Sequence, residues 1–257
     1  MNLTFAHKSR PFLKRLMALL PLWFLACSTS GAPSAPQDTN TVYVSKTISV
    51  GIGKDFDGLG KLYEWVGKGD CSQTEGMPPM FKVSAGAKLR NLQMKNAPDG
   101  IHIAGSNVIL DNITNLDVCE DAISIKLDKN KRAPQNILII NSKFFDCEDK
   151  AIQITRGSNI LIAKNEFHRC AKAIRVKEKA TDIRFEQNKV YQAKVAVKVT
   201  GGNGSASDNL IDGAKVAFWA EKDGRFIVNN DNRVNNVTEI YRETELGKII
   251  IEPESNR

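Results

Sequence analysis

Residues 151–176 read AIQITRGSNILIAKNEFHRCAKAIRV, so the alternating aliphatic pattern that opens the stretch returns 22 residues later. Aliphatic side chains at every second position are typical of a β-strand. The pattern occurs six times in the chain, at intervals of 22, 29, 22, 22 and 22 residues. The six runs are GIHI from Gly100, AISI from Ala122, AIQI from Ala151, AIRV from Ala173, VAVKV from Val195 and AFWA from Ala217.

A second series of strand-like runs lies between members of the first. The one long interval has seven extra residues, which we assign to the polar stretch LDKNKRAPQN (127–136). A fixed period with short strands in every repeat predicts an all-β fold, a single-stranded right-handed parallel β-helix over residues 41–245 with coils of about 22 residues. Residues 246–257 are expected to be a C-terminal tail. The second series comprises NVILDNI (107–113), NILIINS (136–142), NILIAKN (159–165) and DIRFEQN (182–188).

Stacked coils place equivalent residues in columns about 4.8 Å apart. Side chains alternate across a strand, so one set of columns should point into the core and the other should face outward. One asparagine per repeat, at 112, 141, 165 and 188, is expected to satisfy backbone groups at a bend. The inward set is Ile101, Ile103, Ile123, Ile125, Ile152, Ile154, Ile174 and Val176, and the outward set is His102, Ser124, Gln153 and Arg175.

The N-terminus has the features of an export signal. Residues 1–26 contain four Lys or Arg residues and no acidic residue, and they end in the apolar run LMALLPLWFLA, which is too short to span a bilayer. Cys27 follows directly, which predicts cleavage before it and lipid attachment to its thiol, with residues 27–40 as a flexible tether. The alternative is ordinary cleavage near Gly31. The protein is therefore expected to be exported, either as an outer-membrane-anchored lipoprotein or as a secreted protein.

Charge and cysteine content narrow the function classes. Removing the four basic residues of 1–26 changes the net charge from +7 to +3, which is compatible with an acidic polymer as partner. The sequence has no basic run interleaved with aromatic residues, so nothing in it indicates a nucleic-acid partner. Four cysteines remain, and in an exported protein they allow up to two disulfides with three connectivities left open. The four are Cys71, Cys119, Cys147 and Cys170.

A column of charged residues precedes the alternating runs. Two acids are followed by three lysines, and Glu120 adds a third carboxylate beside the second acid. A row of surface salt bridges would explain such a column without any function. However, three carboxylates close together repel one another unless a cation is present, and calcium takes six to eight oxygen ligands. The column comprises Asp99, Asp121, Lys150, Lys172 and Lys194.

Several segments in order resemble a known enzyme family. They cover about 120 residues closely and extend more loosely to about residue 220, and together they resemble a pectate lyase of polysaccharide lyase family 3, a family with a parallel β-helix fold. The segments are FDGLGKLY (56–63), GDCSQTEGMPPMFKVSAGAKLRNL (69–92), APDGIHIAG (97–105), LDVCEDAISIK (116–126), EDKAIQ (148–153) and AKAIR (171–175).

The resemblance implies a role for particular residues. Calcium would be held by Asp99, Glu120 and Asp121, and the catalytic base would be Lys150. The substrate-binding cations implied are Lys126, Lys172 and Arg175, and Glu75 would make a secondary cation or substrate contact. The chain departs from the family pattern at Ile103, which stands where many members have cysteine, in one residue gained between Asp99 and Glu120, and in its longer 127–136 loop.

The implied reaction is a calcium-dependent β-elimination of polygalacturonate that yields 4,5-unsaturated oligogalacturonates. The C5 proton lies next to a carboxylate that is already negative. Removing this proton adds negative charge there, so positive charge is needed to stabilise it. Lys150 must be neutral to act, and calcium and neighbouring cations are expected to lower its pKa, with activity rising into the alkaline range. Arg175 is the second candidate for the base, although guanidinium groups hold their proton strongly. A salt bridge to Asp121 or Asp149 is the non-catalytic interpretation of Lys150.

Other interpretations remain open. The chain is alternatively a non-catalytic lipoprotein that binds acidic polysaccharide. A polygalacturonate hydrolase is disfavoured because it needs a second pair of acids, whereas here cations follow the acids. His102 is expected to be a hydrogen-bonded structural residue, and Cys119 a packing residue or a disulfide partner. A monomer is expected.

Overall fold

The computed structural model describes residues 40–69, 71, 76–128 and 130–253. These residues form strands and turns without any helix, so none of their segments is a helix long and apolar enough to cross a membrane. The predicted signal peptide (1–26), Cys27 and almost all of the predicted tether (27–40) lie outside the described residues, as does Glu75.

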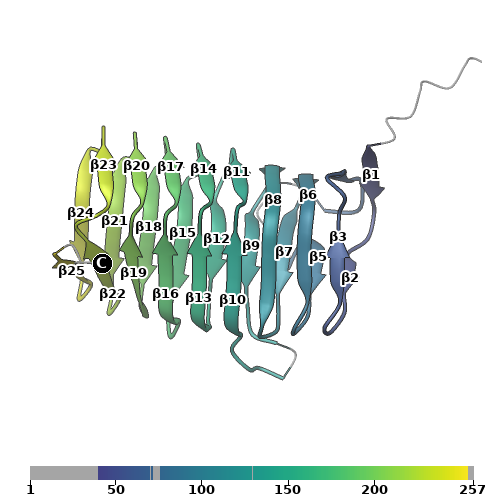
Figure 1. Cartoon of the computed structure of the whole chain (residues 1–257), viewed down its shortest axis with the longest axis horizontal. Helices are drawn as coiled ribbons and strands as arrows, with labels where there is room; N and C mark the ends of the chain where they lie inside the picture. The colour runs from purple at the N-terminus through teal and green to yellow at the C-terminus, as the bar shows by residue number, and fades with distance from the viewer. Residues whose placement is uncertain (1–39, 70, 72–75, 129, 254–257) are drawn as a thin grey trace, which may run out of the picture. The chain divides into compact units, whose positions relative to one another are not determined.

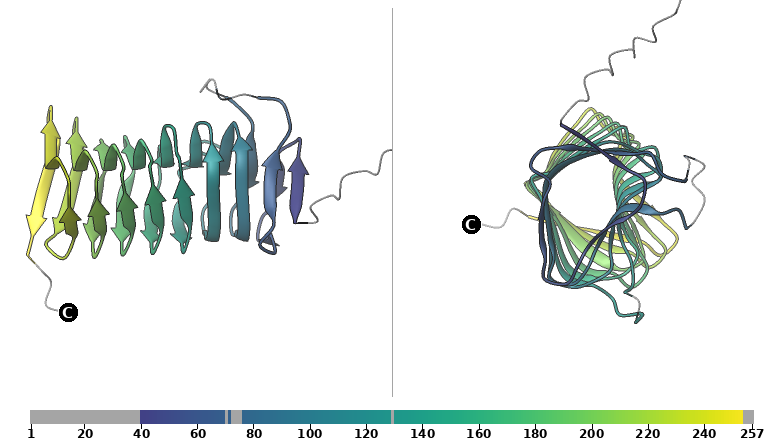
Figure 2. Two further views of the ribbon diagram at one scale, coloured as in Figure 1. Left: turned by 90° about the horizontal axis from the view of Figure 1, so that it is seen from above. Right: turned by 90° about the vertical axis from the view of Figure 1, so that its right-hand side faces the viewer.

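The strands stack into a parallel β-helix, which confirms the predicted fold (Figure 1). One face of the coils is a nine-stranded sheet, to which each coil contributes one strand. Viewed along the long axis, successive coils superpose as a ring (Figure 2). The strands of the nine-stranded sheet are β2 (Ile48–Val50), β5 (Pro79–Val83), β7 (Asp99–Ile103), β9 (Asp121–Ile125), β12 (Lys150–Ile154), β15 (Lys172–Lys177), β18 (Val195–Thr200), β21 (Val216–Glu221) and β24 (Glu239–Thr244).

The remaining strands form a 16-stranded sheet that covers the other two faces. It turns the corner within single strands, since the long β8 pairs with both β10 and β11. The segment predicted as a C-terminal tail contains β25, which pairs with β22. The strands are β1 (Thr41–Val44), β3 (Asp55–Asp57), β4 (Leu62–Trp65), β6 (Lys88–Ala97), β8 (Val108–Val118), β10 (Gln135–Ile140), β11 (Lys143–Phe145), β13 (Ser158–Ala163), β14 (Glu166–His168), β16 (Thr181–Glu186), β17 (Lys189–Tyr191), β19 (Asn203–Ser207), β20 (Leu210–Asp212), β22 (Arg225–Asn229), β23 (Arg233–Asn235) and β25 (Lys248–Glu252).

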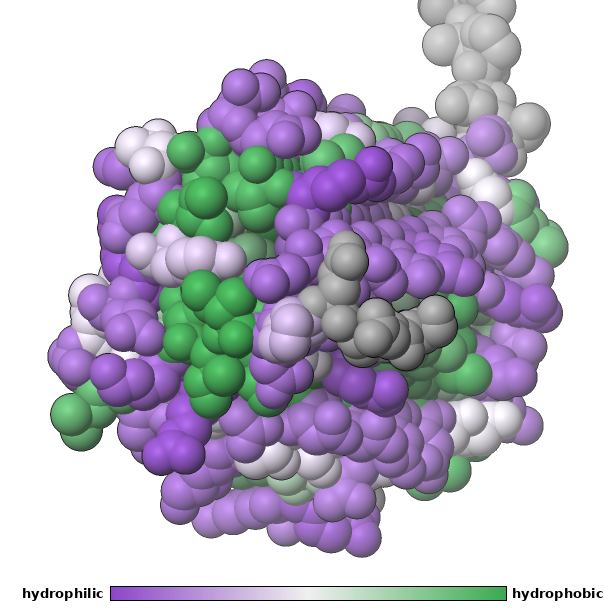
Figure 3. All heavy atoms as spheres, turned by 60° about the vertical axis from the view of Figure 1, so that its left-hand side comes forward, coloured by the Kyte–Doolittle hydropathy of each residue, from purple (hydrophilic) through white to green (hydrophobic). Residues whose placement is uncertain are grey.

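The core is built from the predicted inward columns. All eight predicted aliphatic residues, from Ile101 to Val176, are fully buried. Register pairs Ile123 with Ile152, so the extra residues of that coil lie in the turn between β9 and β10, as expected. Apolar side chains gather on the surface at the C-terminal end of the solenoid (Figure 3). Large apolar side chains exposed there are Ile240, Tyr241, Leu246, Ile250 and Ile251.

The predicted asparagine column was partly wrong. Asn165 and Asn188 do lie in a buried ladder, in which the backbone N–H of Asn165 donates to Asn188 Oδ1 at 3.0 Å. Asn112, within the long β8, and Asn141, directly after β10, instead have positive φ, a conformation that asparagine tolerates well. The ladder is continued by Ser142, Asn209 and Asn232.

We expect Asn188→Ala to lower the free energy of unfolding by about 1–3 kcal/mol. Its side chain accepts from the Asn165 backbone and donates to Ile162 O at 2.8 Å, so alanine leaves buried backbone groups unpaired. Denaturant unfolding measures the change. Asn235→Ala, at an exposed strand position, is the control and should change stability by less than about 0.5 kcal/mol. Equal effects of the two substitutions would contradict a stabilising role for the ladder.

Candidate active site

Parallel pairing places the charged residues of the nine-stranded sheet on neighbouring strands. Lys150 of β12 lies between Asp121 of β9 and Lys172 of β15 in register. Asp99 begins β7, the next strand beyond β9. Gly100 allows this close approach, because a Cβ there would lie 2.2 Å from Ala122 O. The site is therefore assembled by the stacking of coils.

The predicted column does not continue to Lys194. Lys172 pairs with Val195, so this coil is one residue longer than the pattern indicated. Arg175 accordingly pairs with Lys198, whose Nζ lies 3.0 Å from Glu221 Oε2 and 3.6 Å from the centre of the Trp219 ring. Sequence reasoning missed Lys198. The other four residues of VAVKV (195–199) are all apolar, so the alternation does not show which of them face the core.

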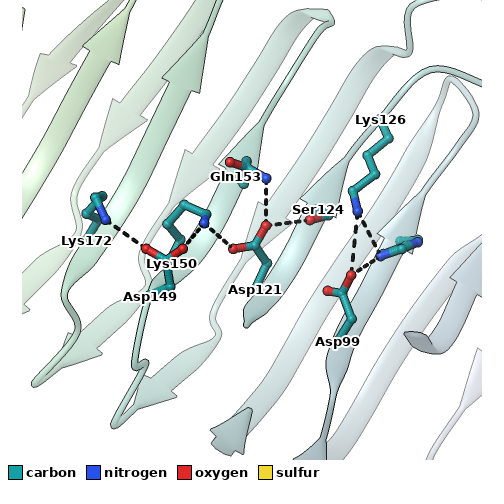
Figure 4. Close-up of polar contacts among 9 residues, drawn as sticks. Asp99, Asp121, Ser124, Lys126, Asp149, Lys150, Gln153 and Lys172 are labelled. Atoms are coloured by element: carbon teal, nitrogen blue, oxygen red, sulfur yellow. Dashed lines mark hydrogen bonds and ion pairs between the residues drawn. The ribbon is translucent and has the colours of Figure 1, made fainter. Parts of the chain in front are cut away.

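Asp121 is almost fully buried under a set of donors. Its Oδ2 accepts from Ser124 Oγ at 2.9 Å and from Gln153 Nε2 at 2.7 Å, and its Oδ1 lies 3.0 Å from Lys150 Nζ (Figure 4). Ser124 and Gln153 belong to the set expected to face outward, and both are nevertheless buried where they donate to this carboxylate. Burial raises the pKa of Asp121; Lys150 and Ser124 oppose the shift, and the charge of Asp99 adds to it.

Lys150 is enclosed by two carboxylates. Its side chain is 6% exposed and contacts Asp149 as well as Asp121, and Lys172 Nζ donates to the other oxygen of Asp149 at 2.8 Å. Burial acts to lower the pKa of Lys150, but the two acids outweigh it and raise the value. Burial acts to raise the pKa of Asp149, but hydrogen bonds from Lys150 and Lys172 outweigh it and lower the value. Among the protein's own groups, Asp121 and Asp149 thus raise the pKa of Lys150, and the expected lowering of that pKa by calcium stays a prediction. Sequence reasoning treated Asp149 only as a salt-bridge partner.

Asp99 forms a second polar group beside the first. It is 2% exposed, its Oδ2 contacts His102 Nε2, and Lys126 Nζ lies 3.5 Å from the same oxygen. Asp99 Oδ1 is buried and accepts no hydrogen bond from the described residues. His102 therefore has the structural contact expected of it, and Lys126 turns toward the acids.

The predicted calcium ligands do not form one cluster in this arrangement. Within the described residues, no group of three His, Cys, Asp or Glu side chains is placed to hold a metal ion. The carboxylates of Asp99 and Asp121 each face a lysine instead, at 3.5 Å and 3.0 Å. Arg175, the other predicted base, has a buried Nε with no hydrogen-bond partner among the described residues.

Two disulfides flank the site and resolve the open connectivity. Cys71 is joined to Cys119, and Cys147 to Cys170. Cys119 comes directly before Glu120, so the first bond ties a preceding loop to the start of β9. The second joins adjacent coils next to Asp149. Both bonds restrain the turns that carry the acids.

Comparisons with known proteins identify the family of the chain. A family model described as pectate lyase matches residues 32–239. The probable pectate lyase F of Aspergillus terreus is 34% identical over 122 residues, which are 46% of this chain and 50% of that protein. The protein of the same name from Aspergillus flavus is 32% identical over 142 residues, 54% of this chain and 58% of that protein. The chain thus spans about half the length of the curated relatives it matches.

Solved structures support the fold. Endopolygalacturonase I from Stereum purpureum, determined with two galacturonate molecules, aligns with a TM-score of 0.51 at 15% identity, covering 83% of this chain and 92% of that chain. Such a low identity shows a shared solenoid and carries no argument about chemistry. The match of residues 32–239 to the family model covers most of the sequence. This chain belongs to the pectate lyase family.

Proposed function

We propose that the protein is a calcium-dependent pectate lyase of polysaccharide lyase family 3 that cleaves polygalacturonate by β-elimination. The observation that carries the proposal is the row of two buried acids and a buried lysine on one sheet face of a chain in the pectate lyase family. Polygalacturonate is negatively charged because it is a polymer of uronic acids. The cations that would pair with it, Lys126, Lys172 and Arg175, lie on the same sheet face or at its edge.

The donor types in the site fit calcium, although no three acids of the described residues are placed together to hold it. Carboxylate oxygens are the ligands that Ca²⁺ prefers, and the buried Asp99 Oδ1 has no donor among the described residues. Asp99 and Asp121 would hold the ion, and Glu120, adjacent to Asp121 in the chain, would add a third carboxylate. When bound, calcium supplies positive charge that stabilises negative charge on a uronate carboxylate.

Lys150 is the proposed base. It accepts the proton from C5, the C5–H electron pair forms the C4=C5 double bond, and the C4–O bond breaks; the departing oxygen is protonated by solvent. Lys172 and Arg175 provide positive charge for the uronate carboxylate as its negative charge grows. Because Asp121 and Asp149 raise the pKa of Lys150, we expect activity to increase into the alkaline range.

The remaining assignments belong to the same proposal. Glu75 would make a secondary cation or substrate contact. Export would follow from the signal features of residues 1–26, either with a lipid on Cys27 or as a secreted protein, and the protein would act as a monomer.

Incubation of the purified protein with polygalacturonate and Ca²⁺ should produce ultraviolet-absorbing unsaturated oligogalacturonates. A chelator should stop their formation, because the buried acids would lose their cation. New reducing ends without the chromophore would instead identify a hydrolase. Binding of the polymer without any cleavage would support the non-catalytic alternative.

A further inference from the structure

A pocket of about 790 Å³ lies beside the proposed active site, past the C-terminal ends of β5, β7 and β9. Its size is within the range of sites that hold small ligands, about 300–1,000 Å³. The ends of β5 and β7 contribute Lys82, Ser84 and Ala104, and the long turn between β9 and β10 contributes Asp128, Arg132 and Pro134. That turn contains the extra residues of the 29-residue coil, so the insertion supplies part of the pocket's lining.

The wall of the pocket is held in place by hydrogen bonds. Asp128 Oδ1 accepts from the backbone N–H groups of Asn130 and Arg132, each at 2.8 Å, and Asp128 N donates to Arg132 O at 3.0 Å. The end of the turn is anchored to the next coil, where Ser158 N donates to Pro134 O at 3.1 Å. A preformed wall lowers the entropy cost of binding a ligand.

The pocket is continuous with the charged row of the site. Lys82 on β5 pairs in register with His102 on β7, and His102 contacts Asp99. On the other side, the turn begins directly after Lys126, which lies 3.5 Å from Asp99. A polymer that follows the stacking direction along the column of His102 would therefore reach Lys82 at the pocket.

The charge of the pocket favours an anion. Lys82 is exposed and has no ion-pair or hydrogen-bond partner in the described part of the chain. The Arg132 side chain is 75% exposed. The pocket's carboxylate, Asp128, is engaged by backbone N–H groups and by Arg132 Nε at 2.8 Å, and hydrogen bonds from the Arg132 backbone lower its pKa, so it remains an acceptor within the turn.

We propose that this pocket binds one further uronate unit of an acidic polysaccharide, with its carboxylate paired to Lys82 and Arg132. The inference rests on the proposed function, because it extends the substrate path from the same site. Long substrates would occupy the pocket, and the shortest cleavable oligomers would not. The inserted turn would then set how strongly the protein prefers long chains.

The test is the double variant Lys82→Ala/Arg132→Ala. Loss of two partly exposed ion pairs should weaken binding of long polygalacturonate about three- to tenfold, measured by affinity electrophoresis and as KM. Turnover of the shortest cleaved oligomer should be unchanged. Ala104→Phe, which fills the pocket without changing its charge, should weaken binding of the long polymer as well. Lys143→Ala/Arg184→Ala, on the other sheet, is the matched control and should leave binding unchanged.

The outcomes separate this proposal from the proposed function. An active wild-type enzyme whose Lys82/Arg132 variant binds long polymer as tightly as the control would overturn the pocket assignment alone. A wild-type protein that binds the polymer without forming unsaturated product would overturn the lyase function, and the binding measurements would still decide on the pocket. A protein that neither binds nor cleaves the polymer would overturn both.

Discussion

Lys150→Arg is expected to lower kcat on polygalacturonate about 10²–10⁴-fold while the protein remains folded. Arginine keeps the positive charge that neutralises Asp121 and Asp149, so both acids stay paired. A guanidinium group holds its proton and cannot accept one from C5. Formation of unsaturated product gives kcat, and denaturant unfolding reports whether stability is retained.

Lys150→Met separates charge from basicity. It should be as inactive as Lys150→Arg and also less stable by about 3–5 kcal/mol, because the buried Asp121 loses its cation while Asp149 keeps only Lys172. Lys189→Arg is the matched control, since Lys189 is 52% exposed and pairs with Glu166 on the other sheet. Near-normal kcat in Lys150→Arg would exclude Lys150 as the base and would make Arg175 the residue to test next.

Asp121→Asn should weaken Ca²⁺ binding on the order of a hundredfold, since the charge of the ligands tunes calcium affinity. Asparagine keeps the shape of the side chain and one acceptor for Ser124 and Gln153, so the effect reports mainly the lost charge. Isothermal titration calorimetry measures the Ca²⁺ affinity, and activity should shift to higher free Ca²⁺ by a similar factor.

The matched control is Asp111→Asn on β8. There the side chain accepts a bond from Asn141 Nδ2 at 2.9 Å on the other sheet, and Ca²⁺ binding should be unchanged. If Asp121→Asn binds Ca²⁺ as tightly as the wild type does, the cation is not held by Asp121 and the proposed ligand set is wrong.

The fold was predictable because a solenoid repeats its signal. Each coil shows the same alternation, so the columns of Ile123, Ile152 and Ile174 support one another, and one irregular coil does not hide the period. Register was less predictable where a strand is apolar on both faces. Before VAVKV the column was therefore expected to contain Lys194, whereas the structure places Val195 there, one residue later.

The site was predictable in its strand positions and less so in its contacts. The placement of Asp121, Lys150 and Lys172 on adjacent strands follows from the coil period. The contact of Lys150 with Asp149, the residue before it, depends on the conformation of the turn that leads into β12, which no periodicity encodes. The same holds for Gln153, whose bond to Asp121 joins residues 32 positions apart.

A crystal structure of Lys150→Arg with Ca²⁺ and a galacturonate oligomer tests the central claim most directly. The account predicts a cation bound by Asp99 and Asp121, a uronate carboxylate on that cation, and C5 of the same sugar beside the end of side chain 150. A cation held by other residues, or an oligomer bound on another face of the solenoid, would contradict it.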